Sequence, residues 1–253
     1  MLFNTISKKY IKNHLEGSPY NIEVKRRVSS TNTLMKERAH CDEKEYSVLI
    51  ASMQTAGRGR MGRRFYSPKN TGVYMSILFR IRENQNPLLL TTDAAVCLAR
   101  VFEEMTGEKA EIKWVNDIYM NKRKVCGILT EGVGKYAVLG IGINVLPPKK
   151  DFPDDIKGIA GSVFKKRGAY LRERVIVKFL SEFMNVYQNP ERETLLKEYK
   201  ERSMILGREI LILKSEERET ATAINIADDY SLIVKKENGE ITSLSSGDVS
   251  IKI

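Results

Sequence analysis

The chain contains few of the residues that build metal sites and disulfide frameworks. It has three cysteines and two histidines in 253 residues, and Cys41, Cys97 and Cys126 lie far apart. Zinc sites need several such ligands at short spacings, and disulfide frameworks use an even set of cysteines. Neither His14 nor His40 has a second ligand at metal-binding spacing. We therefore predict reduced cysteines, surface histidines and no metal-ligating residues.

Long apolar segments are also missing. No stretch approaches the roughly 18 apolar residues that a membrane span needs. Residues 1–15 carry lysines where a secretory signal would need its apolar segment. The composition, 42% hydrophobic and 29% charged, is that of an ordinary globular protein. The sequence thus predicts a cytoplasmic protein without a membrane partner, long enough for a catalytic domain of roughly 200 residues and a small appendage.

The standard nucleotide-binding loops are absent as well. No Walker A pattern occurs in the chain. A G-x-G-x-x-G pattern is present at Gly57, Gly59 and Gly62, but residues 67–70 are turn-like and a strand-like segment follows them. A dinucleotide fold needs a helix directly after the glycines, so that the helix N-terminus faces the pyrophosphate. We therefore exclude a Rossmann site and a P-loop.

The apolar patterns that are present predict an α+β protein. Strand-like segments lie at residues 46–53, 73–82, 111–115, 125–130 and 136–145, and helical segments at 31–40, 91–105, 170–188 and 190–202. A loop follows Pro147-Pro148. Strands joined by short links, with one long helix among them, favour a mixed β-sheet flanked by helices over repeated βαβ units.

The last 50 residues differ from the rest in pattern and in charge. Short strand-like segments lie at residues 209–213, 220–226, 231–234 and 241–244, and Asn238-Gly239 is a hairpin signal. Residues 204–253 carry a net charge of −3, which leaves +13 on residues 1–203. We predict a catalytic domain over 1–203 and a small β-barrel domain over 204–253. The basic excess of the first domain suits an anionic substrate, an acidic partner or RNA.

A glycine-rich loop between two strands carries four arginines. Arg58, Arg60, Arg63 and Arg64 lie among the glycines of residues 54–64. Glycines allow close backbone approach, and guanidinium groups bind carboxylates or phosphates with two hydrogen bonds. These residues alone leave three interpretations open: a loop that closes over an anionic intermediate, an RNA-binding loop, or a solvated charged turn.

A second polar segment follows a predicted strand. The sequence Lys113-Trp114-Val115-Asn116-Asp117 precedes Lys124, which enters the next strand. One interpretation gathers Lys113, Asn116, Asp117 and Lys124 at an edge of the sheet. The alternative, favoured on these residues alone, is a simple turn begun by Asn-Asp, with Trp114 in the core and the lysines exposed. Further along, the glycines of residues 140–145 lie within a strand, where they usually mark a close backbone or ligand approach.

Together, in order and spacing, these segments resemble the biotin protein ligase family. Ser30-Thr31-Asn32 matches its S-T-N element, residues 54–63 its Q-T-x-G-R-G-R-x-G-R loop, residues 113–117 its K-W-P-N-D element, residues 124–131 K-x-x-G-I-L-x-E, and residues 140–145 G-I-G-I-N-V. The resemblance extends from about residue 28 to the C-terminus. Val115 replaces the usual proline, and Phe65 stands where relatives often have tryptophan.

The resemblance implies a fold and an activity. The fold would be a class II synthetase-like catalytic domain with an SH3-like C-terminal barrel. The activity would be that of a biotin–[biotin carboxyl carrier protein] ligase, which uses ATP and Mg²⁺ to form biotinyl-5'-AMP and transfers biotin to a specific lysine of a carboxylase carrier protein or domain. Only about 28 residues precede the first motif, which implies the form without the N-terminal DNA-binding domain and no DNA partner. A homodimer is compatible with the family.

The resemblance also assigns site residues. Those with catalytic roles are Arg58, Arg60, Lys124, Lys113 and Asp117. Those that bind biotin or ATP are Ser30, Thr31, Asn32, Gln54, Gly57, Arg58, Gly59, Arg60, Arg63, Trp114, Asn116, Lys124, Gly127, Gly142 and Asn144. Arg58 and Arg60 would hold the carboxylate and the adenylate phosphate, Lys124 would bind the biotin carboxylate, and Lys113, Asn116 and Asp117 would face the ATP phosphates.

Two other functions compete with this one. A lipoate ligase or octanoyl transferase is related in fold, but those relatives are expected to show a glycine triplet after an Arg-Arg pair, whereas here Arg63-Arg64 leads into Phe65-Tyr66. A basic RNA-binding protein is the second alternative. Its small barrel would be acidic here, and the sheet lacks the aromatic platform on which single-stranded RNA stacks.

Overall fold

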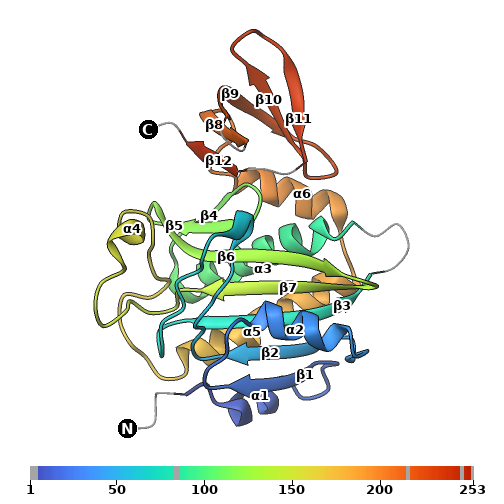
Figure 1. Ribbon diagram of the computed structural model, residues 1–253, viewed down its shortest axis with the longest axis vertical. Coiled ribbons are helices and arrows are strands. Elements are labelled where there is room, and N and C mark those ends of the chain that lie inside the picture. Colours follow the sequence, from blue (N-terminus) through green and yellow to red (C-terminus); the bar gives the residue numbers. More distant parts are fainter. Residues whose placement is uncertain (1–4, 82–85, 215–216, 246–247, 252–253) are drawn as a thin grey trace.

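The computed structural model describes residues 5–81, 86–214, 217–245 and 248–251. Its larger part is a seven-stranded sheet in the order β1-β2-β3-β7-β6-β5-β4 (Figure 1). The strands are β1 (Asn21–Lys25), β2 (Ser47–Ala51), β3 (Val73–Arg80), β4 (Ala110–Lys113), β5 (Asp117–Met120), β6 (Arg123–Val133) and β7 (Tyr136–Ile143). Strands β1 and β2 are parallel, and the other neighbouring pairs are antiparallel. The predicted α+β class with a mixed sheet is confirmed.

Helices cover the two faces of this sheet unequally. The helices are α1 (Lys8–His14), α2 (Thr31–Ala39), α3 (Leu88–Thr106), α4 (Asp154–Lys157), α5 (Leu171–Gln188) and α6 (Arg192–Glu201). Leu139 and Ile141 of β7 belong to the main core with α3 and α5, whereas Val138 belongs to a smaller cluster with Met35 of α2. Because side chains alternate along a strand, α2 lies on the opposite face from α3 and α5.

Four helices and strands of this part were not predicted: α1, α4, β1 and β5. Helix α1 buries only Ile11, so it has no apolar stripe to detect. Strand β1 is a short edge strand with a mostly polar sequence. The segment 117–120, which lies between the predicted strands 111–115 and 125–130, is strand β5, and the chain reverses after it at Asn121 and Lys122, which have φ values of 50° and 60°. Positive φ at both central residues is typical of a tight hairpin between antiparallel strands.

The C-terminal part forms a second sheet at one end of the molecule, beside α6 (Figure 1). Its five antiparallel strands are β8 (Glu209–Lys214), β9 (Glu217–Ile226), β10 (Leu232–Lys236), β11 (Ile241–Leu244) and β12 (Asp248–Ile251), in the order β11-β10-β9-β8-β12. The four predicted strands and the hairpin at Gly239, with φ of 87°, are confirmed. Strand β12 was not predicted, and the SH3-like barrel class stays a prediction.

The two sheets meet at the segment that follows β4. The indole Nε1 of Trp114 donates a hydrogen bond to the backbone oxygen of Tyr230 at 2.9 Å. The Tyr199 hydroxyl of α6 donates to the Val115 oxygen at 3.0 Å, and its ring meets that of Tyr230 edge to face. These contacts connect the C-terminal sheet to the strand-end segment that carries Asn116 and Asp117.

Cys97 and Cys126 are buried and Cys41 is exposed, all as free thiols. In the described ranges, no helix combines the length and apolar character required to span a bilayer.

Candidate active site

A cavity of about 280 Å³ lies over β6 and β7, next to the start of α2. Fourteen of the residues assigned from the sequence line it: Ser30, Thr31, Asn32, Gln54, Arg58, Gly59, Arg60, Arg63, Lys113, Asn116, Asp117, Lys124, Gly127 and Gly142. Residues far apart in the chain thus gather on one face of the sheet. We call this space the motif cavity.

Three assigned residues do not line the motif cavity. Trp114 is 3% exposed and hydrogen-bonds to the C-terminal sheet, so the core covers its ring. Gly57 lies within the glycine loop, where an added Cβ would lie 2.5 Å from the oxygen of Phe65. Asn144 follows the end of β7, and its backbone bonds to Val125 and Val163. For these three, the structure shows a role in supporting the loop or the sheet.

The glycines of β6 and β7 make room for side chains that cross the sheet. Gly127 and Gly142 are paired across the two strands. An added Cβ on Gly142 would lie 2.5 Å from the Phe65 ring, and one on Gly127 would lie 3.3 Å from it. An added Cβ on Gly140 would overlap Asn32. The strand glycines therefore allow a ring and an amide to lie directly on the sheet and form the floor of the cavity.

The glycine loop is anchored by polar contacts at two of its arginines. Arg60 Nη1 donates to Asn116 Oδ1 at 2.8 Å, and Asn116 Nδ2 donates to the Ile128 oxygen at 2.7 Å. Arg58 is half exposed, and its Nη2 lies 3.5 Å from Glu131 Oε1. A short 3₁₀ turn at Arg60–Gly62 turns the loop back, with Met61 at φ 53°.

Glu131 lies at the centre of a polar network beneath Arg58. Its Oε1 pairs with Lys36 Nζ at 2.9 Å, and its Oε2 accepts from Asn32 Nδ2 at 3.0 Å. Burial raises the pKa of Glu131, but the hydrogen bonds from Lys36 and Asn32 outweigh burial and lower the pKa overall. The carboxylate is therefore charged at neutral pH and can hold the arginine near the cavity. Sequence reasoning matched Glu131 to a motif but gave it no role.

Lys124 and Asp117 form a close pair at the other end of the motif cavity. Lys124 Nζ lies 2.6 Å from Asp117 Oδ2, and both side chains are largely covered, with 29% and 19% exposed. Asp117 Oδ1 is buried and has no hydrogen-bond partner among the described residues. The interpretation that gathers Asn116, Asp117 and Lys124 is thus correct in its geometry. The alternative was correct in placing Trp114 in the core and wrong in exposing the lysines, since Lys113 and Lys124 are half-buried.

Uncharged donors and acceptors gather where α2 begins. Ser30 caps the helix, and its hydroxyl accepts from the Thr33 N–H at 3.4 Å. The backbone N–H of Thr31 donates to Gln54 Oε1 at 2.8 Å, and Gln54 Nε2 donates to Ser67 Oγ at 3.0 Å. Ser30, Thr31 and Gln54 thus give this part of the motif cavity uncharged donors and acceptors, next to Asn32, whose amide bonds to the charged Glu131.

Further lining residues were not assigned from the sequence. They are Arg64, Phe65, Tyr119, Ile128, Leu129, Gly140, Ile141, Ile156 and Ile159. Ile156 of α4 and Ile159 just after it come from the segment after Pro147, which gives no periodic signal, and only the fold brings them to the site. In total, six arginines and lysines but only one carboxylate, Asp117, line the motif cavity. Such a site attracts anions.

Comparison with known proteins agrees with this geometry. Residues 24–146 match the biotin/lipoate A/B protein ligase family. Over 160 residues, the chain is 39% identical to the bifunctional ligase/repressor BirA of Bacillus subtilis. The matched region covers 60% of this chain and 49% of that protein. The chain therefore spans about half the length of the first curated relatives that it matches. It is 26% identical over 243 residues to the biotin--[acetyl-CoA-carboxylase] ligase of Mycobacterium tuberculosis, covering 90% of this chain and 88% of that one.

A solved structure extends the similarity over the whole fold. The biotin protein ligase from Aquifex aeolicus, in complex with biotin and ATP, superposes with a TM-score of 0.78 at 27% identity. The superposition covers 92% of this chain and 98% of that one, so it includes both sheets. The sequence motifs, the motif cavity and these similarities agree: the chain is similar to biotin protein ligases over both sheets, and its residues 24–146 match the biotin/lipoate A/B protein ligase family.

Proposed function

We propose that the chain is an ATP-dependent biotin protein ligase. It would activate biotin as biotinyl-5'-AMP and transfer the biotin to a lysine of a biotin carboxyl carrier protein or domain. The observation that carries this proposal is the motif cavity, which six cationic side chains line together with the uncharged side chains of Ser30, Thr31 and Gln54. The names of the relatives support the choice of biotin, and none of the relatives reported above is a lipoate ligase.

The cationic end of the cavity suits the first step. A biotin carboxylate oxygen attacks the α-phosphorus of ATP, and pyrophosphate leaves. Two anions must meet for this bond to form, so fixed positive charges must offset their repulsion. We assign Arg58, Arg60 and Arg63 to the phosphate and the carboxylate, and Lys124 to the carboxylate, which is supported by their position in the cavity lining. Each charge-assisted hydrogen bond contributes on the order of 1.5–3 kcal/mol.

The uncharged side chains of the lining suit the ureido ring of biotin. A cyclic urea offers two N–H donors and one carbonyl acceptor and carries no charge. Ser30, Thr31 and Gln54 supply hydroxyl and amide groups of both kinds. Asn32 lies over Gly140 between the two ends, with its Oδ1 accepting from Ser76 at 2.6 Å, which fixes the orientation of its amide.

Lys113, Asn116 and Asp117 are proposed to face the ATP phosphates. Mg²⁺ uses few protein carboxylates and keeps waters and substrate phosphates as ligands. Asp117 fits that donor set, because one buried oxygen has no hydrogen-bond partner among the described residues. The described residues contain no cluster of three or more metal-ligating side chains. When bound, Mg²⁺ would neutralise charge on the phosphates, and Asp117 would be its one carboxylate ligand from the cavity lining.

The second step requires a neutral acceptor amine. The lysine nitrogen attacks the acyl carbon, AMP leaves, and the proton passes to a base. Asp117 is our candidate for that base, because it is the carboxylate that lines the cavity. We expect Asp117→Asn to slow biotin transfer from preformed biotinyl-AMP by at least about tenfold in a single-turnover assay. Asp155→Asn, an exposed change in α4, is the control, and transfer at the wild-type rate in Asp117→Asn would remove this role.

The activity is tested by isotope exchange. Incubation with ATP, Mg²⁺ and radiolabelled pyrophosphate should give labelled ATP only when biotin is present. Lipoate and octanoate serve as matched acids, since all three offer a carboxylate on an aliphatic chain. Exchange with lipoate or octanoate but not with biotin would replace this proposal with the lipoate ligase alternative.

The remaining assignments are also proposals. The division into a catalytic domain, 1–203, and a C-terminal domain, 204–253, is supported by the two separate sheets. An acidic carrier protein as partner is supported by the net charge of +13 on residues 1–203. Cytoplasmic location stays a prediction from the sequence, which does not decide between a monomer and a homodimer.

A further inference from the structure

A second cavity, of about 540 Å³, lies away from the motifs. Thr5 and Ser7 of the N-terminal segment, Asn70 of the loop before β3, and the residues that lead into α5 line it. It shares no lining residue with the motif cavity. We call it the α5 cavity.

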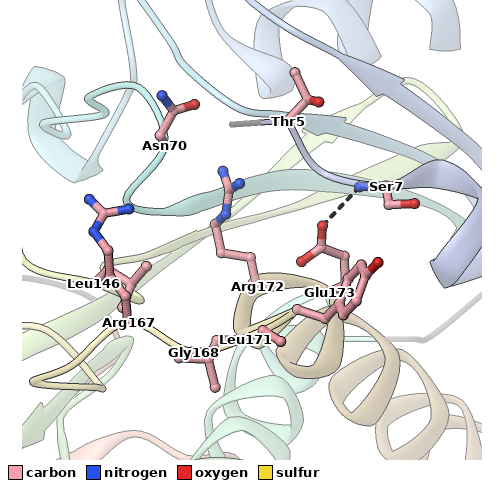
Figure 2. A pocket seen from close by; sticks show the side chains of 11 residues that line it. Thr5, Ser7, Asn70, Leu146, Arg167, Gly168, Leu171, Arg172 and Glu173 are labelled. Atoms are coloured by element: carbon pink, nitrogen blue, oxygen red, sulfur yellow. Dashed lines mark hydrogen bonds between the residues drawn. The ribbon is translucent and has the colours of Figure 1, made fainter. Parts of the chain in front are cut away.

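Two guanidinium groups line one side of the α5 cavity. Figure 2 shows the side chains of Arg167 and Arg172 extending into it, with the amide of Asn70 on the same side. Arg172 is 4% exposed, and burial, with a smaller effect from Arg167, lowers its pKa. Two neighbouring cations, one of them buried, create a positive potential that an anion inside the cavity would reduce.

The opposite side carries the negative charge of Glu173. Its Oε1 accepts a hydrogen bond from the Ser7 N–H at 2.9 Å, which ties this carboxylate to the N-terminal segment (Figure 2). The two arginines thus exceed the carboxylates of the lining by one charge. Arg172 lines this cavity with the small part of its surface that is exposed, whereas Arg167 is exposed and is the more open of the two arginines to a ligand.

We propose that the α5 cavity binds a small oxyanion, through a phosphate or carboxylate group held by Arg167, Arg172 and the amide of Asn70. Guanidinium groups bind such groups with paired hydrogen bonds, and an amide adds a neutral donor. The concave shape favours a small molecule over an extended peptide. The site is independent of the ligase proposal, because none of its residues lines the motif cavity.

The test measures the thermal unfolding midpoint of the full chain against inorganic phosphate, with ionic strength held constant by KCl. Arg167→Gln removes a guanidinium from the cavity, and Arg174→Gln is the matched control, an exposed arginine of the same region that does not line it. We expect the midpoint of wild type and Arg174→Gln to rise saturably with phosphate. The Arg167→Gln variant should need about tenfold more phosphate for the same rise in the midpoint, because one charge-assisted hydrogen bond to the anion is lost. A parallel titration with acetate distinguishes a carboxylate ligand from a phosphate ligand.

Three results would overturn the proposal. The first is no rise in the midpoint with phosphate or acetate beyond that with chloride. The second is the same phosphate dependence in Arg167→Gln and Arg174→Gln, which would place all binding elsewhere. The third is loss of the Arg167-dependent response in an Arg60→Ala background, which would assign it to the motif cavity. Arg172 is left unchanged because its burial makes it a folding risk.

Discussion

Arg60 and Arg58 are held by different partners, and the difference bears on their roles. Arg60 Nη1 donates to the neutral oxygen of Asn116, so the positive charge of the guanidinium is not offset by this contact. Arg58 lies beside the carboxylate of Glu131, which Lys36 also contacts. An incoming phosphate would compete with the carboxylate of Glu131 for Arg58, but with the neutral amide oxygen of Asn116 for Nη1 of Arg60. We therefore expect Arg60 to contribute more to retention of the adenylate.

The change Arg60→Ala tests this expectation. It should accelerate the dissociation of biotinyl-AMP by roughly 10- to 100-fold, because one charge-assisted hydrogen bond is lost. The dissociation rate can be followed by chasing labelled biotinyl-AMP with unlabelled biotin and ATP. The control is Arg38→Ala, which removes an arginine paired with Glu23 outside the cavity. Equal dissociation rates in the two variants would contradict the role of Arg60.

Strands β6 and β7 act together with the loop that crosses them. Phe65 lies against Gly142 and Gly127, so the loop can approach the sheet only where both strands lack side chains. The same strands carry another glycine, Gly132, near which an added Cβ would meet nothing within 4 Å. A Cβ on Gly142 would therefore collide with the Phe65 ring, whereas a Cβ on Gly132 would meet no atom within 4 Å.

Alanine at these two positions should have different consequences. Gly142→Ala should displace Phe65 and lower the free energy of unfolding by about 1–3 kcal/mol, the usual cost of overpacking. Gly132→Ala should leave stability unchanged or raise it slightly, because glycine in a strand is entropically unfavourable. Urea unfolding measures both, and biotin titration should show weaker binding only in Gly142→Ala. Similar stability losses in both variants would indicate a general requirement for glycine in these strands.

Ionic contacts between helices connect distant parts of the whole molecule. Arg192 at the start of α6 donates two hydrogen bonds of 2.9 Å to Asp93 of α3, whose side chain is 3% exposed. Burial raises the pKa of Asp93 to about 6 from an ordinary 3.8, although Arg192 acts in the opposite direction. The folded chain therefore takes up a proton at Asp93 more readily than the unfolded chain does.

This shift has a defined effect on stability. Because the pKa of Asp93 is higher in the folded state, its contribution to the free energy of unfolding is greatest below pH 4 and declines as the pH rises to about 6. We expect Asp93→Asn to lack this decline, so that its stability relative to wild type improves by up to about 3 kcal/mol between pH 4 and 7. Urea unfolding across that range measures the difference. Asp155→Asn should parallel wild type, and parallel curves for Asp93→Asn would show that its pKa is not raised.

The order of motifs and the apolar periodicity were sufficient to predict much of the molecule. Strong patterns, such as the helix around Ala94 and the strand around Ile77, were recovered to within a few residues. The start of the helix at Thr31 and the hairpin at Gly239 were recovered because local backbone chemistry determines them. Weakly patterned elements such as α1 and β1 were not, since their positions depend on contacts with the rest of the fold.

Tertiary packing alone decided which polar residues share a site. Trp114 and Asn116 are two positions apart, yet one is in the core against Tyr230 and the other contacts Arg60 across the cavity. Local sequence specifies which residues can form a strand or a turn, because those choices depend on near neighbours. It does not specify which face meets which segment, because that depends on burial against residues distant in the chain, as with Phe65 on Gly142.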